Sequence, residues 1–165
     1  QTRLSAAYKG IMALILKNHC KDFISGSEMD FASYVGEATD IHHIFPANYC
    51  EQQKIDIKRW NSVINKTPIY ARTNRIIGGY APTKYLSSIE RNHGVDTADL
   101  NNYLESHLID VEAIRRDDFD TYFQNRANAI YDLIEKATGK TVAGRENNDT
   151  DLNDEVVTEE PEIFL

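Results

Sequence analysis

The sequence predicts an α+β fold that is mostly helical, with one small sheet in the first half of the chain. Apolar residues recur at spacings of three and four over residues 4–15 and 118–138, which is the pattern of a helix with one buried face. Two short strand-like segments, at 41–45 and 67–71, are separated by an irregular stretch and are expected to pair. The length of 165 residues suits one domain with one sizeable core.

The remaining elements are predicted from their start and stop signals. Pro82 is tolerated in the first turn of a helix, while Gly94 and Gly139 are typical of helix ends. His107 lies near the end of an expected helix, where a capping role is predicted. The expected helices cover residues 3–20, part of 48–61, then 73–77, 82–92, 99–108, 111–116 and 118–138.

The net charge of −8 is unevenly distributed. Residues 145–165 hold eight acidic side chains and one basic side chain, so nearly all of the negative charge lies there. Residues 40–91 hold eight basic and four acidic side chains, which points weakly to a polyanion partner or, equally, to solvated helix faces. The tail at 141–165 is expected to be disordered and solubilising; the alternative is that it mimics DNA and restrains the basic face.

Several classes of protein do not fit this composition. The longest apolar run, residues 11–16, is far shorter than the roughly 20 residues of a membrane span, and its flanking lysines do not suit a signal peptide. Cys20 and Cys50 lie 30 positions apart, which argues against a zinc knuckle and a disulfide scaffold. A reducing, cytoplasmic location is therefore expected. Because the chain begins with Gln1 and not Met, we expect a fragment of a longer protein.

The segment most informative about chemistry is residues 40–46, with the sequence DIHHIFP. His42 and His43 lie in an apolar, strand-like frame, where one imidazole can bind a metal and the other can act as a base near neutral pH. Asn74 follows at the start of an expected helix and offers an amide oxygen as a second ligand. Strand alternation points the two histidines to opposite sides, so we expect a strand end or a bulge at His43.

These segments resemble the HNH nucleases, whose ββα-metal fold begins with a strand carrying Asp or His, then His, then Ile-x-Pro. The spacing of nine positions between Asn65 and Asn74 is similar to that in the HNH domains of RNA-guided CRISPR nucleases. The resemblance is closer to the C-terminal nuclease domain of GmrSD-type modification-dependent restriction enzymes and covers residues 4–140. The matching segments are KDFISG at 21–26, HHIFP at 42–46, NKTP at 65–68, TNRIIG at 73–78, APTKYL at 81–86 and IEKATGK at 134–140.

The resemblance implies a role for each matching residue. His43 resembles the general base that deprotonates the attacking water, and His42 occupies the position of a metal ligand. Asn74 matches the second metal ligand. Asn65, the other predicted catalytic-site residue, matches the central asparagine whose amide ties the two strands together and orients the histidine segment. Asp40, which strand alternation places on the same face as His42, either orients that histidine or joins the metal ligands.

The expected cofactor is one divalent metal ion. Mg²⁺ is the default because it retains water and binds phosphate, while an imidazole ligand also suits Mn²⁺, Ni²⁺ or Zn²⁺. Lys66, Arg72 and Arg75 lie close in sequence to the expected ligands. They are therefore candidates to bind DNA phosphates, with solvated helix-face charges as the equal alternative.

Together these expectations define an HNH endonuclease domain over residues 1–140, with a core at about 38–92 and helical flanks at 3–20 and 98–138. The resemblance implies hydrolysis of DNA phosphodiester bonds, by nicking or cutting, as the nuclease module of a bacterial antiphage restriction system. The N-terminal NTP-dependent sensor domain of such proteins is expected to be missing from this chain, and no membrane partner is expected. Two alternatives stay open: a non-catalytic DNA-binding module and an RNA-cleaving toxin on the same fold.

Overall fold

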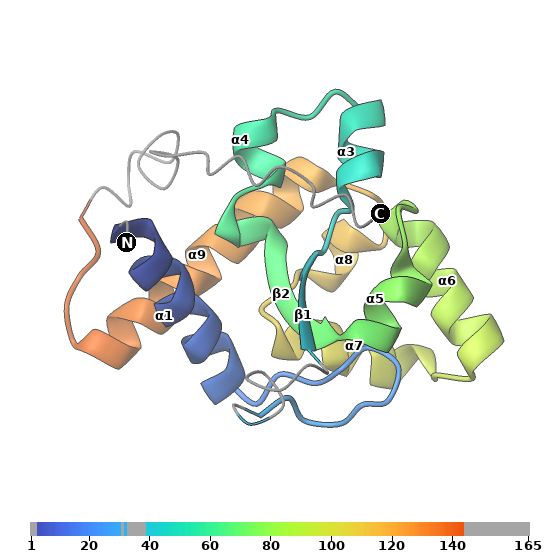
Figure 1. The fold of residues 1–165 in the computed structure, drawn as a ribbon, viewed down its shortest axis with the longest axis horizontal. Helices are drawn as coiled ribbons and strands as arrows, with labels where there is room; N and C mark the ends of the chain where they lie inside the picture. The colour runs from blue at the N-terminus through green and yellow to red at the C-terminus, as the bar shows by residue number, and fades with distance from the viewer. Residues whose placement is uncertain (1–2, 31, 33–38, 144–165) are drawn as a thin grey trace, which may run out of the picture.

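A computed structural model describes residues 3–30, 32 and 39–143 (Figure 1). The fold is α+β and mostly helical, as predicted, and its two strands form one antiparallel sheet. Strand β1 (Thr39–His43) pairs with β2 (Lys66–Tyr70) in a continuous register that sets His43 opposite Lys66 and Thr39 opposite Tyr70. This hairpin is the framework on which the predicted site residues are arranged.

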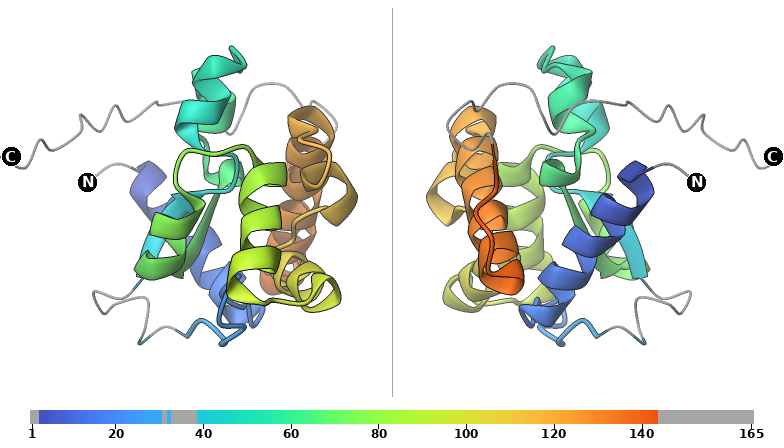
Figure 2. Two further views of the ribbon diagram at one scale, coloured as in Figure 1. Left: turned by 90° about the vertical axis from the view of Figure 1, so that its right-hand side faces the viewer. Right: turned by 90° about the vertical axis from the view of Figure 1, so that its left-hand side faces the viewer.

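Helices lie on both sides of the hairpin (Figures 1 and 2). Helix α5 packs against both strands, while α1 packs against β2 and against the long helix α9. The helices are α1 (Arg3–Lys17), α3 (Ala47–Gln52), α4 (Ile57–Trp60), α5 (Ala71–Ile77), α6 (Pro82–His93), α7 (Thr97–Ser106), α8 (Val111–Ile114) and α9 (Phe119–Thr138), with a 3₁₀ turn at Val63–Asn65.

The helices of the C-terminal half begin and end at the capping residues of the sequence. Asp96, Asp110 and Asp118 each accept a hydrogen bond from a backbone N–H in the first turn of α7, α8 and α9. Gly94 and Gly139 end α6 and α9 with φ of 68°, a left-handed conformation that favours glycine. These helices therefore form within two residues of their predicted bounds.

The irregular stretch between the strands was predicted less accurately. It contains two short helices, α3 and α4, where part of 48–61 was expected to form one. Lys54 has a positive φ of 57°, which interrupts the helix, and Asp56 caps α4 by accepting a hydrogen bond from the N–H of Lys58. Strand β1 starts and ends two residues earlier than predicted, and its end at His43 is one of the two outcomes expected there.

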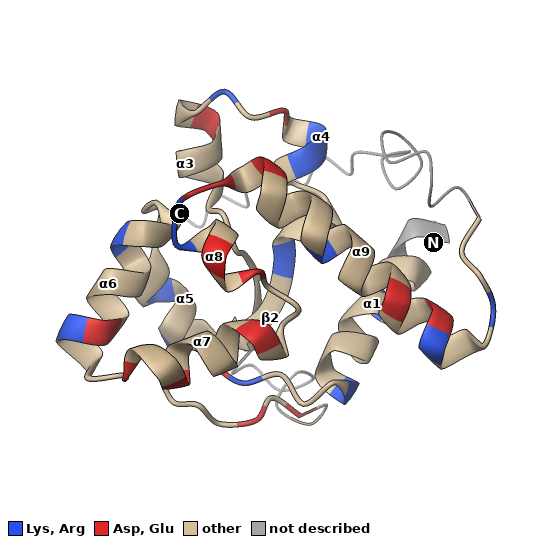
Figure 3. Ribbon diagram, turned by 180° about the vertical axis from the view of Figure 1, so that it is seen from behind, with Lys and Arg blue, Asp and Glu red and all other residues tan. Residues whose placement is uncertain are grey.

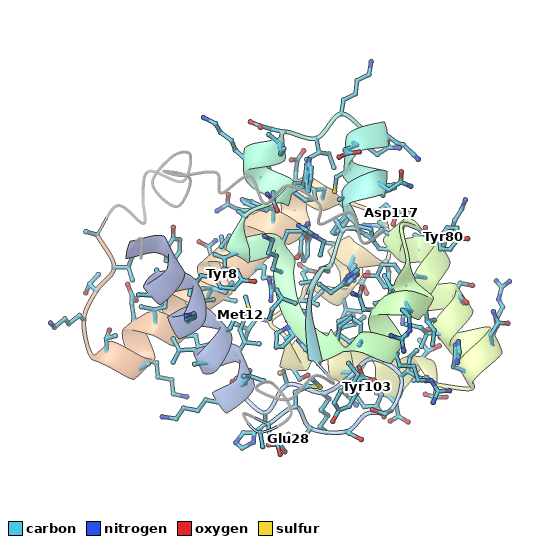
Figure 4. All side chains as sticks on the ribbon, in the orientation of Figure 1. Tyr8, Met12, Glu28, Tyr80, Tyr103 and Asp117 are labelled. Atoms are coloured by element: carbon cyan, nitrogen blue, oxygen red, sulfur yellow. The ribbon has the colours of Figure 1, made fainter. Side chains whose placement is uncertain are left out.

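The apolar core has one cluster on each face of the hairpin. The larger includes Ile69 of β2 and Ile77 of α5, together with side chains of α6 to α9. The smaller lies between α1 and α9, and Figure 4 shows Tyr8 and Met12 of α1 directed toward the hairpin. Cys20 and Cys50 are buried, and burial raises the pKa of both thiols to about 12.

Two predictions concern regions at the limits of what the structure describes. Among the described residues, none of the helices combines the length and the apolar character needed to cross a membrane. The tail predicted for 141–165 lies outside the described residues from residue 144 onward.

Candidate active site

Asn65 is a fully buried residue that joins the end of β1 to the start of β2. Its Oδ1 accepts a hydrogen bond from the N–H of Phe45 at 2.9 Å, and its Nδ2 donates to the carbonyl oxygens of Phe45 at 2.9 Å and Trp60 at 2.8 Å. Its own carbonyl oxygen accepts from the N–H of Ile44 at 2.8 Å. The side-chain amide of Asn65 thus bonds to the backbone N–H and carbonyl of Phe45, in place of the backbone of a paired strand. Regular strand pairing therefore stops, and β1 ends at His43.

His43 lies at this strand end, with its ring partly exposed. Its Nε2 is 3.0 Å from Oδ1 of Asn61. An amide oxygen only accepts hydrogen bonds, so Nε2 carries the proton and donates it, and Nδ1 is the basic nitrogen of the neutral ring. The ring also packs edge-on against the indole of Trp60, with 5.5 Å between centroids. Both contacts hold the imidazole in one orientation.

The surroundings of His43 favour its neutral form. Burial lowers the pKa of His43 from the ordinary 6.5, the hydrogen bond with Asn61 partly opposes this, and the positive charge of Lys66 lowers the pKa further. At neutral pH the ring is therefore unprotonated and able to accept a proton at Nδ1.

His42 lies on the opposite face of the hairpin. It is 8% exposed and pairs with Thr67, so it shares a face with Thr67 and with Ile69 two positions further along β2. Ile69 packs in the same apolar cluster as Ile77, so this is the face that α5 covers. The backbone of Asp40 belongs to β1, whereas its side chain lies outside the described part of the structure.

Asn74 lies in α5, the helix that packs on both strands. It precedes the buried Ile77 by three positions and therefore shares its side of the helix. His42 and Asn74 thus belong to the same interface between hairpin and helix. His43 lies on the opposite face of the hairpin from His42, and it is the last residue of β1 that pairs with β2.

The start of α5 is fixed by Asp22, a residue whose role the sequence did not predict. Its Oδ1 accepts from the N–H of Tyr70 at 3.1 Å, and its Oδ2 accepts from the hydroxyl of Thr73 at 2.8 Å. Oδ2 also accepts from the backbone N–H groups of Ile24 and Ser25. This buried carboxylate therefore orients α5, and with it Asn74, relative to β2. An acidic residue between the apolar Cys20 and Phe23 was the available signal.

Arg126 of α9 is the second functional residue that the sequence reasoning missed. Its guanidinium is buried, with Nε donating to the carbonyl of His107 at 3.1 Å and Nη1 donating to the carbonyls of Lys66, at 3.0 Å, and Ile64. These last two residues flank Asn65, so α9 holds the backbone that positions the central asparagine.

Tyr122, one turn earlier on α9, supports the same segment. Its hydroxyl lies 3.3 Å from the carbonyl oxygen of Ile64 and 3.3 Å from Oδ1 of Asn65. Arg126 follows Tyr122 by four positions and precedes the buried Ile130 by four, so it lies on the apolar stripe of the helix. A charged residue within that apolar stripe was the available signal that Arg126 is buried and hydrogen-bonded.

His107 is buried beside the hairpin and does more than cap a helix. It occupies the C-cap of α7, but its ring bridges the hydroxyl of Thr67, 2.6 Å from Nδ1, and the carbonyl of Lys21, 2.8 Å from Nε2. Burial lowers the pKa of His107 to about 4. The predicted position at a helix end is therefore confirmed, and the ring in addition forms a buried link between β2 and the segment that follows α1.

The three cations predicted to bind DNA lie on two elements, Lys66 on β2 and Arg72 and Arg75 on α5. Figure 3 shows basic residues on both elements. Lys66 lies opposite His43 in the register, with its ammonium 5.9 Å from the ring centroid of Tyr8. Arg72 and Arg75 are exposed on α5, beyond the other end of β2, where they line a pocket. The hairpin therefore separates one cation near the predicted base from two near its far end.

The chemistry of the donors fits a weakly held divalent ion. Among the described side chains, no group of three His, Cys, Asp or Glu residues is arranged to hold a metal ion. His42 and Asn74 provide one imidazole nitrogen and one amide oxygen, both neutral. Such a pair leaves coordination positions for water and phosphate oxygens, as Mg²⁺ and Mn²⁺ require.

Comparisons with known proteins add one distant relative. An uncharacterized protein of Methanocaldococcus jannaschii is 32% identical over 115 residues, which cover 66% of this chain and 19% of the relative. The chain thus spans about a fifth of that relative's length, and the relative's name assigns it no activity. No protein-family model matches the chain, and no solved structure matches it. The function is therefore inferred from the site itself.

Proposed function

We propose that this chain is a metal-dependent DNA endonuclease domain of the HNH type. The observation that supports this most strongly is the state of His43. It lies at the end of a strand terminated by Asn65, its Nε2 proton is held by Asn61, and burial keeps its ring neutral. A neutral, oriented imidazole is what a general base for water activation needs.

The proposed reaction assigns a task to each residue. Nδ1 of His43 accepts the proton of the attacking water, while Asn61 keeps the ring in the tautomer that leaves Nδ1 free to do so. His42 and Asn74 would hold the divalent ion, with Asp40 as a further ligand or as the residue that orients His42. When bound, that ion neutralises charge on the phosphate group. Lys66 would bind a neighbouring phosphate.

The wider setting of this activity follows from the motifs. We propose that the domain serves as the nuclease module of a bacterial antiphage restriction system, located in the cytoplasm. An N-terminal NTP-dependent sensor domain would supply recognition of modified DNA. In that case the isolated chain should cut or nick DNA with little sequence preference.

A plasmid and RNA cleavage assay tests the proposal. Supercoiled plasmid and a folded RNA are incubated with the chain in Mg²⁺, in Mn²⁺ and in EDTA, alongside the His43→Ala variant. We expect metal-dependent nicking or cutting of the plasmid that falls by about 10²- to 10⁴-fold in the variant, as is typical for loss of a general base. The His19→Asn variant, which alters an exposed histidine just after α1, serves as the control and should cleave normally.

Each other result contradicts the proposal in a recognisable way. Salt-sensitive DNA binding without cleavage would indicate the non-catalytic binding module. Cleavage of RNA with the plasmid left intact would indicate the toxin. Cleavage that survives both EDTA and His43→Ala would come from neither the predicted base nor a metal.

A further inference from the structure

A pocket of about 770 Å³ lies at the far end of the hairpin from His43. Its walls come from the segment at 22–27, from the junction of β2 with α5, and from the last residue of α6. Its polar lining includes the guanidinium-bearing Arg72 and Arg75, the imidazole of His93, the hydroxyl-bearing Ser25 and Ser27, and the phenol of Tyr70. Of the predicted metal ligands and catalytic residues whose side chains the structure describes, His42, His43, Asn65 and Asn74, none lines this pocket.

The arginines of this pocket differ from arginines elsewhere in the protein. Arg59 and Arg115 form ion pairs with carboxylates, at 2.6 and 2.8 Å. Arg72 and Arg75 are exposed and form no ion pair with any residue that the structure describes. Two cations three positions apart on one helix repel each other, so their shared side of α5 is a place where an anion is stabilised.

The carboxylate in the pocket wall does not neutralise these cations. Asp22 is 1% exposed, and its two oxygens accept five hydrogen bonds from neighbouring backbone and hydroxyl groups. It therefore shapes the wall and leaves the positive charge of the arginines available to a ligand.

The wall opposite α5 has a fixed shape. Gly26 has a φ of 65°, and a Cβ at this position would collide with the hydroxyl of Tyr103. The N–H of Asp22 donates to the carbonyl of Ser27 at 3.0 Å and the N–H of Gly26 donates to the carbonyl of Asp22 at 3.0 Å. The two serines are thus presented by a preformed turn whose backbone only glycine adopts without strain.

We propose that this pocket binds a phosphate group of the nucleic-acid strand, at a distance from the bond that is cleaved. Arginine guanidinium groups and serine hydroxyls are usual donors to phosphate oxygens. The hydroxyl of Ser25 already donates to Asp22, so Ser27 is the serine donor here, and the phenol of Tyr70 offers a surface for the adjoining sugar or base. The proposal rests on the proposed function and deepens it, because it assigns Arg72 and Arg75 to a second site with its own wall.

The register gives the separation of the two sites. Tyr70 and Lys66 are the two ends of β2, and Lys66 lies opposite His43. Four residues of strand span about 13 Å, which equals the rise of roughly four base pairs along the axis of a duplex. A strand whose scissile phosphate lies at His43 can therefore reach the pocket with a phosphate a few nucleotides away.

DNA binding without cleavage tests this site. The anisotropy of a fluorescent 20-base-pair duplex is followed in EDTA, where no metal-dependent reaction takes place, using the whole chain. The double variant Arg72→Gln with Arg75→Gln is compared with Lys84→Gln with Arg91→Gln, two exposed cations of α6 outside the pocket lining. We expect the pocket variant to weaken binding tenfold or more and to reduce the slope of log K against log salt by about two, as for two lost phosphate contacts. The control pair should change affinity by less than threefold.

Competition separates a nucleic-acid strand from a free nucleotide. Inorganic phosphate and a deoxynucleoside 5′-monophosphate are titrated against the bound duplex up to millimolar concentrations. Binding of the monophosphate at the pocket is followed by the NMR signals of the His93 ring. If these signals shift while the pocket variant binds the duplex with unchanged affinity, the pocket is a nucleotide site and the proposal is wrong. Equal affinities of the pocket and control variants for the duplex, with no such shift, would remove the site altogether.

These results are independent of the nuclease test. If plasmid cleavage depends on His43 while the pocket variant binds DNA like its control, the site is wrong and the endonuclease stands. If the pocket variant loses DNA binding while no cleavage occurs with any metal, the site stands and the endonuclease is wrong.

Discussion

The two ends of the β1–β2 hairpin differ in how their polar groups are held. At one end, Asn65 is buried with its side-chain amide fully engaged, and the ring of His43 is fixed by Asn61 and Trp60. At the other end, Arg72 and Arg75 are exposed and form no ion pair with the described residues. The fixed end suits proton transfer, which needs an oriented base, and the exposed end suits binding of a phosphate by solvent-accessible cations.

The rigid end is held largely by residues far away in the sequence. Arg126 and Tyr122 of α9 bond to the backbone on either side of Asn65, across about 60 positions of chain. The exposed end depends on the nearby carboxylate of Asp22, which orients α5 without pairing with its arginines. The comparison therefore predicts that substitutions at the first end affect stability strongly, and that those at the arginines affect binding alone.

The largest effect on stability is expected for Asn65→Ala. This change leaves the N–H and carbonyl of Phe45 and the carbonyl of Trp60 buried without their partner, which we expect to lower the free energy of unfolding by about 3 to 5 kcal/mol. Asn102→Ala, at an exposed position of α7, should change it by less than about 0.5 kcal/mol. Urea denaturation measures both. A loss below about 1 kcal/mol at Asn65 would show that its hydrogen bonds do not hold the strand end.

The next effect is a dependence of stability on pH that comes from His107. Its pKa is about 4 in the folded protein and near 6.5 when unfolded, so the unfolded chain binds more protons between these values. The contribution of His107 to the free energy of unfolding is therefore fully present above pH 6.5. It declines by about 3 kcal/mol as the pH falls toward 4.

Urea titrations between pH 7 and pH 4 measure that decline. The His107→Gln variant should lose this portion of the pH dependence, whereas the exposed His93→Gln should keep it. If the free energy of unfolding depends on pH equally in the wild-type protein and in His107→Gln, then burial does not lower the pKa of His107 and this prediction is wrong.

A smaller effect is expected at Asn61, the residue that holds the Nε2 proton of His43. In Asn61→Ala we expect roughly a tenfold loss of cleavage at neutral pH, because the ring is free to rotate and to change tautomer. The hydrogen bond raises the pKa of His43, so its loss should move the acidic limb of the pH–rate profile to lower pH. Asn61→Asp keeps an acceptor and adds a negative charge, so it should move that limb to higher pH. Profiles that shift in the same direction in both variants would contradict the assigned contact.

Local signals in the sequence were sufficient to predict most of the helices. Aspartates at helix starts and glycines at helix ends act within one turn, so α6 and α9 form close to where they were expected. The positive φ of Lys54 was not predictable because no glycine marks it. One short helix was therefore expected within 48–61, where the structure has α3 and α4.

The residues of the candidate site were assigned from the resemblance of their segments to HNH nucleases, and that assignment stays a prediction. The side chains that support them were not predicted. Asp22 and Arg126 act through contacts between distant segments, and Arg126 bonds to carbonyl oxygens that any sequence possesses. Because every residue has a backbone carbonyl oxygen, the sequence does not indicate which of them Arg126 bonds to. The early end of β1 has the same origin, because a side-chain amide replaces the strand partner.

In the proposed function, His42 and Asn74 hold a divalent ion between the hairpin and α5, while His43 acts as a base without binding it. Electron paramagnetic resonance of Mn²⁺ titrated into the whole chain tests this directly, with the variants His42→Ala, Asn74→Ala and His43→Ala. We predict one bound ion per chain, with affinity reduced tenfold or more in the first two variants and retained in His43→Ala. Unchanged Mn²⁺ affinity in both His42→Ala and Asn74→Ala would contradict the proposed metal centre.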